Sequence, residues 1–210
     1  MTETISRGAA NQAGARTYSD AYAKAGDFLP LQGIDHVEFW VGNARQAAAY
    51  YRALWGFTPV GFSGLETKVR DRASYVMVRN DIRFVFTAPL TPVGEIAEHV
   101  RTHGDGVHDI AFAVDDVESA WRETTTRGAR SAPSPSEPDG GEDGVLRKAS
   151  IHTYGAVLHS FVDRSSDCGT FAPAYRKVQP PGPAAPGFSL TEVHHSVGNV
   201  GPAAVHAVAV

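Results

Sequence analysis

The sequence has one cysteine, no long hydrophobic run and no cluster of basic residues. Because Cys168 is the single cysteine among 210 residues, no disulfide can form within the chain, and we expect a cytoplasmic setting. No stretch approaches the roughly 18 consecutive apolar residues of a membrane-spanning helix, and the N-terminus lacks the apolar core of a secretory signal. The net charge of −4, without a run of Lys or Arg, argues against a nucleic-acid-binding protein. We therefore expect neither nucleic acid nor a membrane as a partner.

Three segments lack regular apolar periodicity, and they suggest how the chain is organised. Residues 1–29 are rich in Ala, Gly, Ser and Thr, which favours a flexible arm. Residues 131–144 contain three Pro, three Gly and four acidic residues, which is typical of an exposed loop. Four Pro and two Gly within 179–187 predict a stiff linker. We therefore expect one domain over 30–178, a linker over 179–188 and the start of a second domain over 189–210.

Between these segments a β-α-β-β-β pattern occurs twice. In the first unit Asn43 is a suitable N-cap for a helix over 44–55, which Gly56 would end. The predicted strands of this unit cover 34–41, 58–62, 74–78 and 82–87. A helix over 93–102 leads to the second unit, which has a strand at 107–114, a helix at 116–127 and strands at 129–132, 146–153 and 156–162.

One such unit cannot bury both of its faces. Two units packed together can form a cupped sheet with the helices outside. The predicted fold class is therefore α+β, with paired βαβββ modules forming a mixed sheet. Its concave interior would suit a small ligand or a metal ion.

Five segments, in order along the chain, resemble the 4-hydroxyphenylpyruvate dioxygenase family. They are HVEFWVGNARQAAAYY at 36–51 followed by GF at 56–57, FSGLET at 62–67, HGDGVHDIAFAV at 103–114, TYGAVLHSFVDR at 153–164 and HHSVGNV at 194–200. The resemblance implies the vicinal oxygen chelate fold, of glyoxalase-like type, with two such domains. In the family the N-terminal domain is largely structural, and the C-terminal one binds Fe(II) through two His and one carboxylate.

The activity implied by this resemblance is that of an Fe(II)-dependent 2-keto acid dioxygenase. Such an enzyme converts 4-hydroxyphenylpyruvate and O2 to homogentisate and CO2 in tyrosine catabolism. The related hydroxymandelate synthases share the scaffold and the HGDGV segment, so a hydroxymandelate product remains an alternative. The WVGNARQAA and TYG segments are more similar to the dioxygenases.

By this resemblance His195 matches the first iron ligand, and Val197 lines the substrate site. His194 would face the opposite way if both histidines lay in a strand. The second His and the Glu would lie beyond Val210, and the final residues do not resemble the continuation of the family. We therefore expect a truncated chain that does not hold Fe(II) stably by itself and is inactive alone.

The N-terminal domain itself offers a weaker candidate metal site. Overlaying the ligand-bearing strands of the family places the three ligands at His36, Asp109 and Ser160, and a second register would place Phe39 at the first position. A Ser hydroxyl replaces a carboxylate poorly, so the set is one ligand short. His108 would face away from Asp109, because strand side chains alternate. We expect His36 to be an ordinary strand residue and Asp109 to accept hydrogen bonds.

Other chemically notable side chains have simpler interpretations. His99 and His103 are four residues apart and predict a solvated helix end. Cys168 has no activating neighbour and is expected to be inert. Six aromatic residues at strand or helix spacing are expected to be core rather than cofactor contacts. They are Trp40, Trp55, Tyr75, Phe84, Phe86 and Tyr154.

Three functional hypotheses follow. The first is a dioxygenase chain acting on an aromatic 2-keto acid and O2, active only when complete. The second is a non-catalytic scaffold that dimerises or associates with a complete homologue. The third is a metal-free ligand-binding domain that uses the cup. A missing second domain would leave apolar surface exposed, which favours self-association into a homo-oligomer.

Overall fold

The computed structural model describes residues 27–132, 146–166, 169–180, 182 and 188–198. The chain divides into two units, Met1–Pro30 and Leu31–Val210, and every helix and strand named below belongs to the second. Most of the predicted arm, loop and linker lies outside the described residues, as do Cys168 and residues 199–210. The domain boundaries proposed from the sequence therefore remain predictions.

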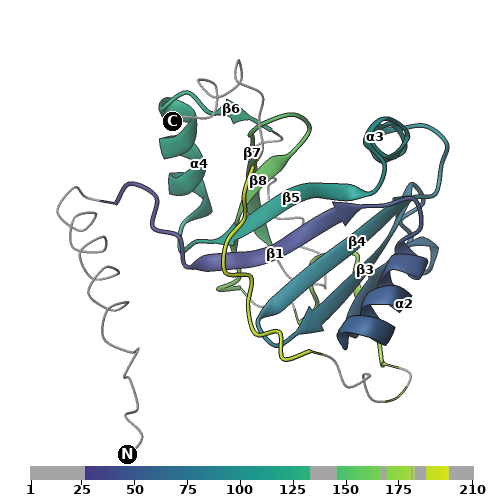
Figure 1. Ribbon diagram of the computed structural model, residues 1–210. Coiled ribbons are helices and arrows are strands. Elements are labelled where there is room, and N and C mark those ends of the chain that lie inside the picture. The colour runs from purple at the N-terminus through teal and green to yellow at the C-terminus, as the bar shows by residue number, and fades with distance from the viewer. Residues whose placement is uncertain (1–26, 133–145, 167–168, 181, 183–187, 199–210) are drawn as a thin grey trace, which may run out of the picture. The chain divides into compact units, whose positions relative to one another are not determined.

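The described residues form one mixed sheet of nine strands in the order β6-β7-β8-β5-β1-β4-β3-β2-β9 (Figure 1). The strands are β1 (Gly33–Trp40), β2 (Thr58–Ser63), β3 (Arg72–Arg79), β4 (Ile82–Pro89), β5 (Gly106–Ala113), β6 (Arg130–Ser131), β7 (Arg147–His152), β8 (Leu158–Asp163) and β9 (Arg176–Lys177). Strands β1 and β5 pair antiparallel and join the two modules. Within the modules β1 pairs parallel with β4, and β5 with β8. The predicted β-α-β-β-β repeat and fold class are confirmed.

Local signals explain where two of the helices begin and end. Asn43 Oδ1 accepts a hydrogen bond of 2.9 Å from Gln46 N at the start of α2 (Ala44–Trp55), and Gly56 ends that helix at a φ of 72°. Asp116 caps α4 (Val117–Thr126) in the same way. The remaining helices are α3 (Glu95–His103) and the short 3-10 helix η1 (Leu65–Thr67).

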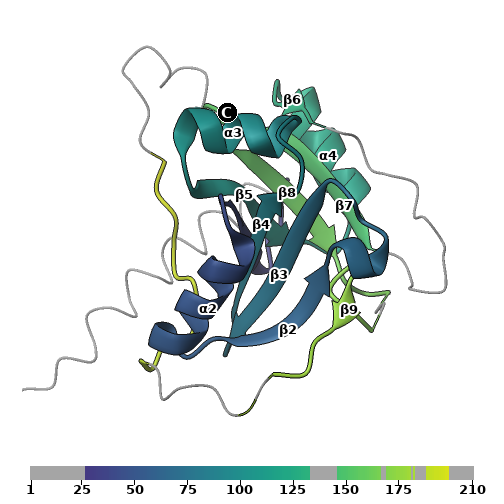
Figure 2. The same cartoon turned by 90° about the vertical axis from the view of Figure 1, so that its right-hand side faces the viewer.

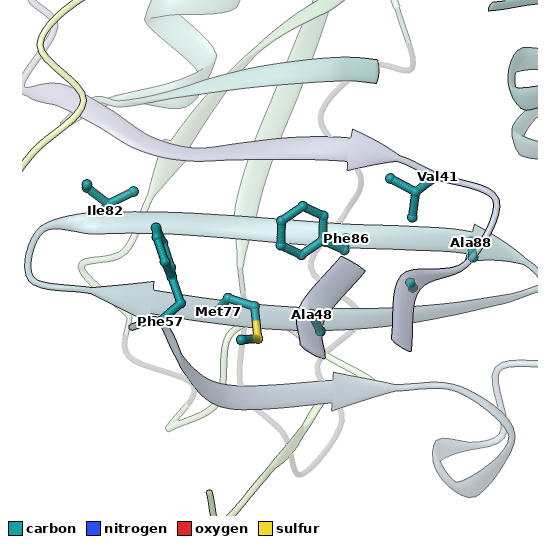
Figure 3. Packing of buried hydrophobic residues seen from close by; sticks show 8 residues of the cluster. Val41, Ala48, Phe57, Met77, Ile82, Phe86 and Ala88 are labelled. Carbon is teal, nitrogen blue, oxygen red and sulfur yellow. The ribbon is translucent and has the colours of Figure 1, made fainter. Parts of the chain in front are cut away.

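The helices α2 and α4 lie against different parts of the sheet, α2 on β3 and β4 and α4 on β7 and β8 (Figures 1 and 2). Beneath α2 lies an apolar cluster that includes Phe57, Met77 and Phe86, all at most 1% exposed (Figure 3). Trp40 is also buried, and Trp55, Tyr75 and Phe84 pack partly buried against the cluster. These aromatic residues are core residues, as predicted, and Tyr154 is half-buried.

Side-chain alternation then defines a second face of the sheet, which we call the inner face. Since Phe86 points toward α2, its neighbour Thr87 on β4 points the other way. Thr87 Oγ1 donates a 2.6 Å hydrogen bond to Glu38 Oε1 and lies 2.8 Å from Ser74 Oγ. The inner face therefore carries polar side chains that come from at least β1, β3 and β4.

Two features were not predicted from the sequence. The strand β9 pairs with β2 at the edge of the sheet, where Figure 2 shows the two side by side. The second is the packing of residues 188–198, which contain no strand, while the proposed start of a second domain at 189 remains a prediction. Leu190 and Val193 pack against the apolar cluster, and Asp81 N donates a 3.0 Å hydrogen bond to Thr191 O.

Within the part of the chain that the structure describes, no helix has the length and apolarity needed to span a bilayer.

Candidate functional site

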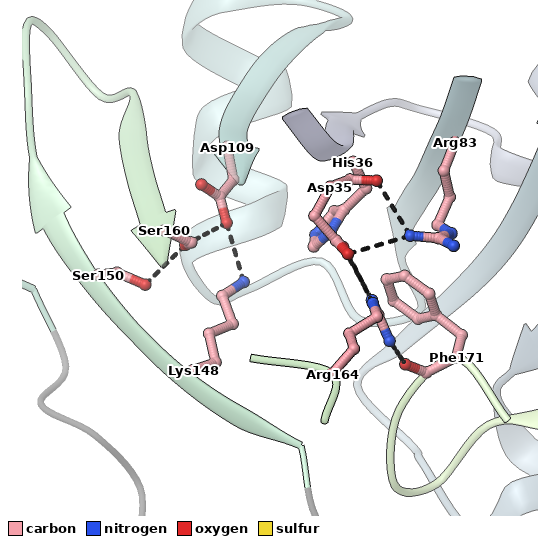
Figure 4. Close-up of polar contacts among 9 residues, drawn as sticks. All are labelled: Asp35, His36, Arg83, Asp109, Lys148, Ser150, Ser160, Arg164 and Phe171. Atoms are coloured by element: carbon pink, nitrogen blue, oxygen red, sulfur yellow. Dashed lines mark hydrogen bonds and ion pairs between the residues drawn. The ribbon is translucent and has the colours of Figure 1, made fainter. Parts of the chain in front are cut away.

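The structure brings together His36, Asp109 and Ser160, the three positions of the weaker candidate metal site, in one region of the inner face. His36 on β1, Asp109 on β5 and Ser160 on β8 come from three strands that are neighbours in the sheet. Their exposed fractions are 3%, 1% and 0%. Figure 4 shows these side chains and the charged residues around them. Phe39, which the alternative register placed at the first ligand position, packs against Tyr51 of α2 and therefore does not lie on this face.

Asp109 is held by a lysine and a serine. Lys148 Nζ on β7 lies 2.8 Å from Asp109 Oδ2, and Ser160 Oγ donates a 2.6 Å hydrogen bond to the same oxygen. Since the Ser160 proton is used there, Ser150 donates to Ser160 Oγ at 2.7 Å. Burial by itself raises the pKa of Asp109 and lowers that of Lys148, but their mutual attraction reverses both shifts. The pair is therefore ionised at neutral pH.

His36 belongs to a second cluster, which is centred on Asp35. The His36 Nδ1 lies 2.6 Å from Asp35 Oδ1. Arg164 makes a two-pronged contact with the same carboxylate at 2.6 and 2.9 Å, and Arg83 adds a third contact at 3.1 Å (Figure 4). Burial raises the pKa of Asp35, but His36 and Arg164 together hold it well below its usual range.

Irregular strand pairing places consecutive side chains on the inner face at two points. Between β1 and β5 the register shifts at Asp35 and again at His108, each of which is an extra residue in its strand. Asp35 and His36 contact each other and are both buried. His108 stacks on Trp40 with ring centroids 3.3 Å apart, and burial lowers its pKa while Glu38 and Asp109 raise it. The prediction that His108 faces away from Asp109 is therefore wrong, because the bulge interrupts the alternation.

Part of the inner face is covered by the chain after β8. Phe171 contacts His36 edge-on at a centroid distance of 5.1 Å, and the Arg164 guanidinium lies 4.8 Å from the centroid of the Phe171 ring. Tyr175 hydrogen-bonds Ser74, and burial together with the Glu38 charge raises the pKa of its phenol. Phe171 and Tyr175 therefore cover side chains of the inner face from β1 and β3.

The donor set on the inner face does not fit Fe(II). His36 has one ring nitrogen engaged by Asp35, and the Ser160 hydroxyl donates to Asp109. Asp109 Oδ1 lacks a partner among the described atoms, but the Lys148 ammonium next to it would repel a cation. Among the residues described, no three or more His, Cys, Asp or Glu side chains are already arranged to hold a metal ion. His36 is paired with Asp35, and Asp109 accepts a hydrogen bond from Ser160, as expected for Asp109.

Lys148, Arg164 and Asp35 were not predicted from the sequence as members of these clusters. Lys148 lies on β7 and Arg164 directly follows β8. Their ion-pair partners, Asp109 and Asp35, are 39 and 129 positions away in the sequence. An inward-facing cation on β7 could have been inferred from Asp109, since a buried carboxylate requires a partner.

The remaining predicted site residues lie elsewhere. His195 and His194 are exposed in the segment 188–198, with their Nδ1 atoms 3.0 Å apart, and Val197 is 81% exposed. Their roles as ligand and substrate contact remain predictions. His99 is only 9% exposed, so the predicted solvated helix end is wrong for His99 and holds for His103, which is exposed.

Comparison with known proteins agrees with this architecture. Residues 35–146 match the model of the Glyoxalase/Bleomycin resistance protein/Dioxygenase superfamily. The chain belongs to this superfamily.

Two superfamily relatives carry the same enzyme name. A 4-hydroxyphenylpyruvate dioxygenase from Pyricularia oryzae is 37% identical over 200 residues, covering 86% of this chain and 48% of the relative. One from Dictyostelium discoideum is 46% identical over 147 residues, covering 69% and 40%. The chain thus spans about half the length of the curated relatives it matches.

A solved structure supports the same placement within the superfamily. A variant of 4-hydroxymandelate synthase from Streptomyces coelicolor superimposes with a TM-score of 0.61 and 28% identity. The match covers 71% of this chain and 43% of the synthase. Sequence and structure therefore both relate this chain to part of a longer dioxygenase-like protein.

Proposed function

We propose that this chain supplies the iron-free half of a 4-hydroxyphenylpyruvate dioxygenase, over residues 30–178, and the start of the iron-binding half, from residue 189 onward. The observation that carries the proposal is the 37–46% identity to relatives of that name over most of the chain. In a complete enzyme the reaction would convert 4-hydroxyphenylpyruvate and O2 to homogentisate and CO2, as part of tyrosine catabolism in the cytoplasm.

The role of this half, in our proposal, is structural. Its inner face holds ion pairs where a metal site would need open ligands, so the Fe(II) would be bound by the other half. There His195 would be the first ligand and Val197 would line the substrate site, with a second His and a Glu supplied by further sequence. The domain over 30–178, the linker over 179–188 and the segment from 189 onward are the corresponding proposed parts.

Oxygen uptake by the purified 210-residue chain tests this proposal. The chain would be supplied with Fe(II), ascorbate and 4-hydroxyphenylpyruvate, alone and after co-expression with the part of the D. discoideum relative that it does not match. We expect no uptake by the chain alone and homogentisate formation from the combination. Homogentisate formed by the chain alone, and lost in His195→Ala, would show that this polypeptide assembles a complete site.

The likeness to 4-hydroxymandelate synthase supports a second candidate, in which the complete enzyme forms hydroxymandelate. Chromatography of the product from the same co-expressed protein separates the two candidates. A folded chain that gives neither product in combination would favour the hypothesis of a non-catalytic scaffold.

A further inference from the structure

Three histidines gather at the end of the sheet where α3 leads into β5. His99 and His103 lie one turn apart on α3, and their ring centroids are 5.0 Å apart. The His108 ring on β5 lies 5.7 Å from that of His99. Trp40 forms one wall of this cluster, stacked on His108 and edge-on to His99 at 5.2 Å. Figure 1 shows α3 directly before β5.

The buried imidazoles of this cluster lack hydrogen-bond partners. His99 is 9% exposed, yet both of its ring nitrogens are buried without a partner among the described atoms, and so is Nδ1 of His108. Each such group costs about 1–3 kcal/mol of desolvation. Three unsatisfied nitrogens in one place require an explanation, such as a bound ion.

The spacing of the rings suits a shared metal ion. With Zn–N bonds of about 2.0–2.1 Å, two imidazoles on one tetrahedral ion have ring centres about 5 Å apart. The observed separations of 5.0 and 5.7 Å are close to that value. A histidine pair four residues apart on a helix is also the spacing that presents two ligands on one face.

We propose that His99 and His103 bind a borderline divalent ion such as Zn²⁺, and that His108 completes the site by turning its ring. The His108 ring must rotate because, among the described residues, no three possible ligands are already placed around one point. The nearby Asp105 carboxylate is engaged by Gly42 N at 2.7 Å, so the donors are imidazoles. An imidazole site favours Zn²⁺, Ni²⁺ or Cu²⁺ over ions that prefer oxygen.

Two further properties of the cluster favour this binding. Burial lowers the pKa of His99 and of His108, so both rings are neutral at pH 7, the form that ligates metal. His103 is exposed, so an ion can enter from solvent and meet that ring first. The proposed site is separate from the iron chemistry of the proposed function and does not depend on it.

Titration calorimetry with Zn²⁺ alone tests the site on the full chain carrying His194→Ala and His195→Ala, which removes the other adjacent histidine pair. We expect saturable binding of one ion per chain. The exposed His103→Ala variant should bind at least tenfold more weakly, and His99→Ala likewise. His152→Ala, which alters a half-buried histidine on β7 outside the cluster, should bind within twofold of its parent.

Circular dichroism shows whether each variant is folded. If His99→Ala does not fold because His99 is buried, the result for the exposed His103→Ala decides the test. Absence of saturable binding, or equal binding by parent and His103→Ala, would overturn the site. Substitution with Co²⁺ should give the intense visible bands of a tetrahedral ion, and His108→Ala should abolish them. Unchanged bands in His108→Ala would overturn its role as third ligand.

Discussion

The ammonium of Lys148 lies 2.8 Å from Asp109 Oδ2 and occupies the position where a metal cation would neutralise that carboxylate. The lysine comes from β7 and the aspartate from β5, two strands separated by β8 in the sheet. The Ser160 hydroxyl between them, on β8, binds the same oxygen. This part of the inner face is therefore stabilised by an internal cation and needs no ion from solvent.

Removal of Lys148 should destabilise the chain. Lys148→Met would leave a carboxylate that is 1% exposed without its counter-charge, and we expect a loss of roughly 2–4 kcal/mol in the free energy of unfolding. The loss should be smaller than for a fully buried ion pair, because a third of the Lys148 side chain is exposed to solvent. Urea denaturation measures the loss.

A matched pair of variants checks the cause of that loss. Adding Asp109→Leu to Lys148→Met removes the unpaired charge and should recover more than half of the stability. Lys177→Met, on the exposed strand β9, should change it by less than about 0.5 kcal/mol. A double variant as unstable as Lys148→Met would contradict the ion-pair explanation.

Stability should fall at both extremes of pH. The pKa values of Asp35 and Asp109 are lowered on folding, so their contribution is complete above the unfolded value of about 3.9 and declines as the pH falls below it. The pKa of Lys148 is raised, so its contribution is complete below about 10.4 and declines as the pH rises through the folded value. Urea midpoints measured from pH 2.5 to 11 should trace both declines.

In the double variant Lys148→Met/Asp109→Leu, stability should no longer fall at alkaline pH, and it should fall less at acid pH than in the parent chain. Glu98→Gln, which removes an exposed partner of Arg101, should leave the shape of the profile unchanged. A profile that is flat between pH 2.5 and 4 in the parent chain would be inconsistent with the lowered carboxylate pKa values.

Arg164 should contribute more to stability than Arg83. It makes two contacts with Asp35 and donates to Phe171 O at 2.7 Å, whereas Arg83 makes one contact with the carboxylate and one with the Asp35 backbone. We expect Arg164→Ala to cost roughly 2–3 kcal/mol and Arg83→Ala about half of that. Thermal and urea unfolding would rank them.

Arg122→Ala is the control, because Arg122 forms an exposed pair with Glu118 on α4 and should cost below about 0.5 kcal/mol. Arg164→Lys should recover only part of the loss, since an ammonium cannot make both contacts with Asp35. Equal costs for Arg164→Ala and Arg122→Ala would show that the Asp35 cluster does not stabilise the fold.

The chain should not retain iron. After incubation with Fe(II) without oxygen and gel filtration, we expect far less than one iron per chain, because the inner-face donors are paired with charged side chains. Iron is measured colorimetrically. Retention near one iron per chain that is lost in His36→Ala would place a metal site on the inner face and refute the proposed division of roles.

Much of the fold follows from local sequence signals. The helix α2 begins and ends where Asn43 and Gly56 predict, because capping and a left-handed C-terminal glycine are properties of neighbouring residues. The hairpin of β3 and β4 likewise follows from its turn, where Asn80 adopts a φ of 49°. The two-residue strand β9 could not be found this way, since only its pairing with β2 defines it.

The candidate site was less accessible to prediction. The overlay placed His36 and Asp109 on one face correctly, but the partners of Asp109 come from a different hairpin. The burial of His99 depends on Trp40, which is 59 positions away, and no pattern among neighbouring residues predicts that contact. The position of His108 depended on a register shift that periodicity cannot reveal.

The two register shifts occur at the same offset, at the third residue of each central strand, Asp35 in β1 and His108 in β5. In a strand, a slip of one residue turns every later side chain to the opposite face. The two bulges avoid such a slip because each absorbs its extra residue, so that deleting Asp35 or His108 would leave the remaining side chains of its strand on their present faces. Each bulge thus adds one side chain to the inner face at the seam between the modules without changing the faces of its neighbours.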